Sequence, residues 1–61
     1  MFVLVRQLRG KDAFYSYRKA WDSEWSYDRA EAVEMSQEEA QEKADYFLEE
    51  ISVFCQVRPA N

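Results

Sequence analysis

The clearest constraint on the fold is an amphipathic helix that begins at Ser36. The run from Ser36 to Glu39 reads S-Q-E-E and matches the capping box S-x-x-E, in which the two side chains satisfy free main-chain donors at a helix start. From there to about Glu50, apolar residues recur at spacings of three and four. We expect this stripe to face the core, and it consists of Ala40, Ala44, Phe47, Leu48 and Ile51. Such a stripe needs an apolar platform, which the rest of the chain must supply.

The segments around this helix have the composition and alternation of β-strands. We predict a strand over 2–8 and a second over 13–21, paired antiparallel through a turn near Gly10. A short hairpin return is predicted over 25–27, one helical turn over 28–32 with Asp28 as its cap, and an extended segment over 33–35. The last strand is predicted over 51–58 and ends at Pro59.

These elements predict one domain, residues 1–61, of the α+β class. We expect a small antiparallel sheet of three or four strands with one amphipathic helix packed on one face, in the order β-β-(β)-α-β. Ten aromatic residues supply core volume that so short a chain would otherwise lack.

Cys55 is the only cysteine, so no internal disulfide can form, and a reducing cytoplasm is the expected location (the host cytoplasm for a phage-encoded chain). The apolar run 1–5 is too short for a signal sequence or a membrane span, and no membrane contact is expected.

Catalytic and metal-binding patterns are missing from the sequence. There is no histidine, the single glycine excludes a glycine-rich phosphate loop, and the single cysteine excludes a zinc-ligand spacing. We interpret Cys55 as a small buried apolar residue. The sequence predicts a protein that is not an enzyme, with no cofactor and no metal.

Charges are sorted along the chain. Residues 1–20 carry five cations and one acid, whereas residues 21–50 carry eleven acids and two cations, within a formal net charge of −4. The outward face of the predicted helix is acidic, and we name it the outer acidic face: Glu38, Glu42, Asp45 and Glu49. Only Glu39 and Lys43 form a favourable i,i+4 pair. The acids either keep a small protein in solution or contact a basic groove on another protein, one that normally holds nucleic acid.

A second candidate surface is aromatic. The sheet face away from the helix is expected to lack cover, with Tyr15, Tyr17 and Phe54 exposed near Lys19 and Arg58. Trp21 and Trp25 would lie around the hairpin, as binding anchors or as a second small core. Protein contact is the first expectation, a homodimer the second and nucleic acid the third. A nucleic-acid-binding module would use the aromatics of the sheet and the cations Arg6, Arg9, Lys11, Arg18 and Lys19.

The segment 36–59 resembles the helix and final strand of the small RNA polymerase inhibitor of T-odd coliphages. The resemblance lies in the run S-Q-E-E-A-Q-E-K-A-D-Y from Ser36 to Tyr46 and in the strand end V-R-P at 57–59. It implies an α/β domain that binds the polymerase jaw and blocks host transcription. Arg58 matches an arginine that the inhibitor uses on its target, and Gln56 stands where the inhibitor has another arginine.

Together these patterns predict a phage-type protein-binding inhibitor or modulator of a host protein with a basic surface. The predicted binding residues are Glu38, Glu42, Asp45, Glu49, Tyr15, Tyr17, Trp21, Trp25 and Arg58.

Overall fold

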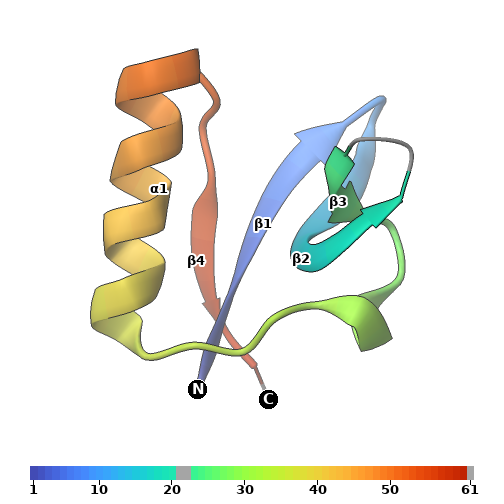
Figure 1. Cartoon of the computed structure of the whole chain (residues 1–61), viewed down its shortest axis with the longest axis horizontal. Helices are drawn as coiled ribbons and strands as arrows, with labels where there is room; N and C mark the ends of the chain where they lie inside the picture. Colours follow the sequence, from blue (N-terminus) through green and yellow to red (C-terminus); the bar gives the residue numbers. More distant parts are fainter. Residues whose placement is uncertain (21–22, 61) are drawn as a thin grey trace.

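The computed structural model describes the main chain of residues 1–20 and 23–60 and the side chains of residues 1–16 and 24–60. It has a four-stranded antiparallel sheet, in the order β3-β2-β1-β4, with one helix packed on one face (Figure 1). The fold class predicted from the sequence is therefore confirmed. The elements in chain order are β1 Phe2–Leu8, β2 Lys11–Ala20, β3 Ser23–Ser26, the 3-10 turn η1 Arg29–Glu31, α1 Gln37–Ile51 and β4 Gln56–Pro59.

The β1–β2 hairpin is closed by the shortest common turn. Leu8 pairs with Lys11, which leaves Arg9 and Gly10 as the two turn residues. Both have positive φ, 54° at Arg9 and 77° at Gly10, as a type I′ turn requires. Glycine adopts this conformation without steric cost. Strand β2 therefore starts at Lys11, two residues earlier than the sequence pattern predicted.

Helix α1 begins where the capping motif predicts. The Ser36 hydroxyl accepts a hydrogen bond from the main-chain N–H of Glu39 at 3.1 Å. The helix ends at Ile51 and is capped by Ser52, whose φ of 56° and ψ of 37° place it in the left-handed region. Strand β4 starts only at Gln56, so the predicted last strand over 51–58 is shorter at its N-terminal end.

The apolar stripe of α1 is buried over about two turns and not along its whole length. Ala40, Ala44 and Phe47 are buried, whereas Leu48 and Ile51 are 51% and 55% exposed. The prediction that the last two face the core is wrong. Figure 1 shows the last turn of α1 beyond the start of β4, so none of the described strands lies beneath that turn.

The core lies between α1 and the sheet. It consists of Leu4, Tyr15, Met35, Ala40, Ala44, Phe47 and Cys55. Segment 33–35 extends this platform because it hydrogen-bonds to both central strands. The N–H of Val33 donates to the carbonyl of Tyr15 at 2.9 Å, and Met35 exchanges two main-chain hydrogen bonds with Phe2.

The sheet face away from α1 is also largely buried along β1. Val3 and Val5 point to that face, since they alternate with Leu4, and they are 2% and 1% exposed. Part of the cover comes from η1, whose Arg29 guanidinium lies 5.9 Å from the centroid of the Phe14 ring. Arg29 also donates to the carbonyl of Ala60 at 2.6 Å. The expectation that this face lacks cover is therefore wrong.

No helix within the described part of the chain is long and apolar enough to cross a bilayer.

Candidate functional site

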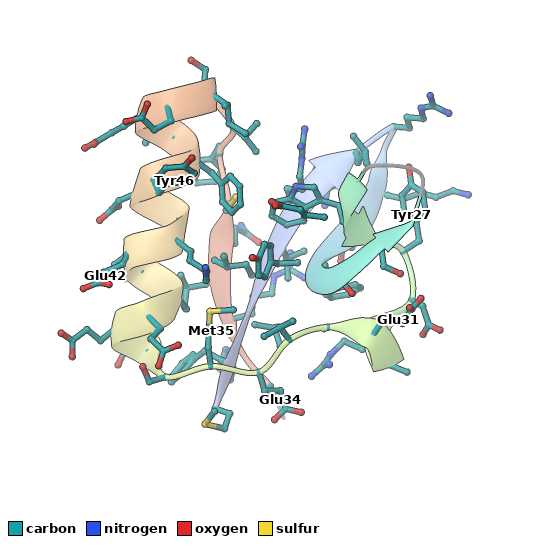
Figure 2. All side chains as sticks on the ribbon, viewed as in Figure 1. Tyr27, Glu31, Glu34, Met35, Glu42 and Tyr46 are labelled. Atoms are coloured by element: carbon teal, nitrogen blue, oxygen red, sulfur yellow. The ribbon has the colours of Figure 1, made fainter. Side chains whose placement is uncertain are left out.

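The outer acidic face forms one exposed surface along α1. Its four acids are all exposed, and they repeat at the spacings that place side chains on one side of a helix. Figure 2 shows Glu42 on the side of α1 that points away from the sheet. An open hollow of about 400 Å³ lies here, lined by Glu38, Glu42 and Asp45 and by the amides of Gln37 and Gln41.

The only cation of α1 does not share this face. The Lys43 ammonium lies 5.1 Å from the centroid of the Tyr15 ring, on the side of α1 that meets the sheet. The predicted i,i+4 pair of Lys43 with Glu39 is not formed within 4 Å in the described residues. The buried aromatic ring competes for the ammonium, and the six acids of α1 are left without a cation on the outward side.

The outer acidic face also lacks neutralisation from the rest of the described chain. Among residues whose side chains are described, no lysine or arginine forms an ion pair with its four acids, and the Asp45 carboxylate accepts only an amide hydrogen bond from Gln41 at 3.1 Å. Neighbouring acids at these spacings repel by roughly 0.2–0.5 kcal/mol per pair. An approaching cationic surface would relieve that repulsion.

The prediction that Tyr15 lies on an exposed aromatic surface is wrong. Tyr15 is only 8% exposed and lies under α1, where its ring is 5.8 Å from both Trp25 and Phe47, centroid to centroid. Trp25 is half-buried and packs on Phe47 at 5.3 Å. Trp25 is therefore neither an exposed binding anchor nor part of a second small core. It packs against the one core between α1 and the sheet, because β2 and β3 place Tyr15 and Trp25 on the side that meets Phe47. Phe54, by contrast, is 70% exposed.

Two further predicted binding residues cannot be placed. The side chains of Tyr17 and Trp21 lie outside the described residues, and so do those of Arg18 and Lys19.

Cations of the N-terminal half lie over aromatic rings, which the sequence reading did not anticipate. The Arg6 guanidinium is 5.4 Å from the centroid of the Trp25 ring, and the Lys11 ammonium is 5.8 Å from that of Tyr27. The rings are half-buried in Trp25 and exposed in Tyr27. Stacking on nucleic-acid bases would require the ring of Tyr15, which is packed inside the protein, and that of Trp25, which is half-buried.

Arg58 lies on the sheet face opposite α1 and is held there by neighbouring strands. Its guanidinium donates to the Asp12 carboxylate at 3.1 Å and to the Gln56 amide oxygen at 2.6 Å and 2.9 Å. The Asp12 carboxylate also accepts from the Gln7 amide. The hydrogen bonds from Arg58 and then Gln7 lower the pKa of Asp12 below its ordinary value. Arg58 and the outer acidic face therefore belong to different surfaces.

Cys55 is buried in the core. Burial raises the pKa of its thiol, an effect that the Arg6 guanidinium partly opposes. The group is thus a protonated thiol at neutral pH rather than a nucleophilic thiolate.

Within the described residues, no group of three or more histidine, cysteine or acidic side chains is arranged to hold a metal ion. Comparison of the chain with protein-family models, curated proteins and solved structures finds no match. The geometry of the chain itself is therefore the basis for a functional proposal.

Proposed function

We propose that this chain is a non-enzymatic protein-binding inhibitor or modulator, of phage type, that docks the outer acidic face of α1 on a basic surface of a host protein. The observation that supports this proposal is that Lys43 turns to Tyr15, so the outward side of α1 presents acids and amides without a cation of the helix. A helix that carries a row of exposed carboxylates attracts a cationic groove at long range and sets the register of contact.

The resemblance of segment 36–59 to the coliphage polymerase inhibitor makes RNA polymerase the first partner to test. More generally, the proposed partner handles nucleic acid, because a groove that accepts phosphates also accepts a row of carboxylates. Binding would then exclude DNA or RNA from the groove, which is how a small protein without catalytic groups can inhibit a large one.

The experiment is capture from a nuclease-treated lysate of a coliphage host with three immobilised baits: the parent chain, Glu42→Lys and Glu34→Lys. Both variants change the net charge by the same amount at exposed positions, but Glu34 lies on segment 33–35 and not on the outer acidic face (Figure 2). We expect a nucleic-acid-handling protein to be retained by the parent and by Glu34→Lys, lost with Glu42→Lys, and released by added DNA. A capture profile that is the same for all three baits contradicts the proposal.

A further inference from the structure

A second surface, of opposite charge, lies at the free edge of β1. Strand β4 pairs with β1 only over residues 2–5, whereas β2 pairs with it over residues 5–8. The β4 side of β1 beyond Val5 therefore has no partner strand among the described residues. The return segment from Ser52 to Phe54 diverges from this edge and leaves a cleft of about 350 Å³, which we name the Arg6 cleft.

The register of the hairpin determines which main-chain groups face the Arg6 cleft. Leu8 and Lys11 flank a two-residue turn and so form a hydrogen-bonded pair, which directs the main-chain groups of Leu8 and Arg6 toward β2. The main-chain N–H and carbonyl of Gln7, which lies between Arg6 and Leu8, point away from β2 and toward the Arg6 cleft. A free N–H and carbonyl at a sheet edge are the groups that an added strand uses.

Arg6 supplies an unused cation at the same place. Arg6 lines the cleft, and its guanidinium lies over Trp25. The guanidinium has no hydrogen-bond acceptor among the described residues, and its Nε is buried without a partner. Arg58, the other arginine of the cleft, already donates to Asp12 and Gln56. A buried, charged donor without an acceptor is costly, and a carboxylate is the acceptor that suits a guanidinium best.

The remaining lining is apolar. Val53 contributes aliphatic surface, and Phe54, which also lines the cleft, is 70% exposed. The volume is at the small end of the range for ligand pockets. The cleft thus combines a strand edge, a guanidinium and an apolar wall within the reach of a few residues of extended chain.

We propose that the Arg6 cleft binds an extended segment of a partner protein, which adds to the edge of β1 beside Gln7 and places an acidic side chain on the Arg6 guanidinium. Charge complementarity selects the acid, and the free main-chain groups select an extended peptide over a free anion. This surface is separate from the outer acidic face and does not depend on the function proposed for that face.

The test is an NMR titration of the labelled chain with a capped peptide, acetyl-Thr-Val-Glu-Val-Thr-amide, followed at the Arg6 Hε and Gln7 amide resonances. We expect both resonances to shift together. Binding should be weaker by about tenfold for the same peptide with Gln in place of Glu, because the charged hydrogen bond is lost. The Arg6→Lys variant, which keeps the charge but lacks the planar guanidinium, should weaken binding of the Glu peptide by a similar factor.

Arg9→Lys is the matched control, since Arg9 is exposed at the hairpin turn and does not line the cleft. Unchanged peptide binding in Arg9→Lys supports the proposal, and equal weakening in both variants overturns it, since the attraction would then be general electrostatics. The proposal also fails if sodium acetate at the peptide concentration shifts Arg6 Hε equally, if a single-stranded oligonucleotide binds more tightly than the Glu peptide, or if neither resonance moves. The amide spectrum of Arg6→Lys without ligand checks that the variant is folded.

Discussion

The ammonium of Lys43 lies 5.1 Å from the centroid of the Tyr15 ring, so the single cation of α1 faces the sheet. Two consequences follow from this one contact. It contributes to the packing of α1 on β2, and it leaves the outward side of the helix to the carboxylates.

We expect Lys43→Met to lower the free energy of unfolding by about 0.5–1 kcal/mol, because the variant keeps the aliphatic packing and loses the attraction of the ammonium to the ring. Urea denaturation at low and high salt measures this loss of stability. Lys11→Met, at the exposed ring of Tyr27, is the comparison and should change stability less. A larger loss in Lys11→Met would contradict the packing role given to Lys43.

Ala44→Asp should unfold the domain. Ala44 is 6% exposed between α1 and the sheet, where a carboxylate would lose its hydration. Circular dichroism and the amide spectrum report the loss. Gln37→Asp places the same side chain at the exposed first turn of α1, where the helix dipole favours an acid, and should melt at or above the parent temperature. An Ala44→Asp variant that melts like the parent would contradict the helix register.

Ser52→Gly should stabilise the chain by about 0.5–1 kcal/mol, since Ser52 ends α1 at a φ of 56° that glycine adopts without the steric cost of a Cβ. Thermal and urea unfolding measure the gain. Ser52→Ala, which keeps the Cβ and lacks the hydroxyl, is the control and should not stabilise. A gain in Ser52→Ala equal to that in Ser52→Gly would assign the effect to the hydroxyl instead.

The Asp12–Arg58 pair predicts a pH dependence. Because the folded chain holds the pKa of Asp12 below its ordinary value, the contribution of this group is present above the ordinary value of about 4 and is lost as the pH falls through the lower, folded value. The stability difference between the parent and Asp12→Asn should therefore be constant near neutral pH and shrink below about pH 4. Asp28 caps η1 and is not a suitable control, so Glu34→Gln serves instead. A difference that grows as the pH falls would contradict the direction of the shift.

Local sequence patterns predicted the positions of the helix and strands well, but they predicted poorly which side chains are buried by the tertiary structure. Ser36, Asp28 and Gly10 act through groups within three residues of themselves, so the two caps and the hairpin turn could be read from the chain. The burial of Tyr15 could not be predicted from the sequence. Its position in the alternation of β2 assigns a face, but which face receives the helix depends on the pairing of β1 with both neighbours.

The features of the candidate site likewise divide into those that local sequence patterns predict and those that they do not. The outer acidic face follows from helical spacing alone, and each of its four acids is exposed as expected. The cation–π contacts of Arg6 and Lys43 and the pairing of Arg58 with Asp12 join residues far apart in sequence, and no local pattern indicates them. The Arg6 cleft likewise arises because β2 and β4 pair with different parts of β1, residues 5–8 and residues 2–5.

The measurement that tests the central claim most directly is the affinity of the captured partner for the parent chain, Glu42→Lys and Glu34→Lys, determined by titration calorimetry at two salt concentrations. We predict that Glu42→Lys weakens binding by about tenfold at low salt and that the loss diminishes at high salt, while Glu34→Lys stays within about twofold of the parent. Equal losses in the two variants, or no loss in Glu42→Lys, would contradict a binding role for the outer acidic face.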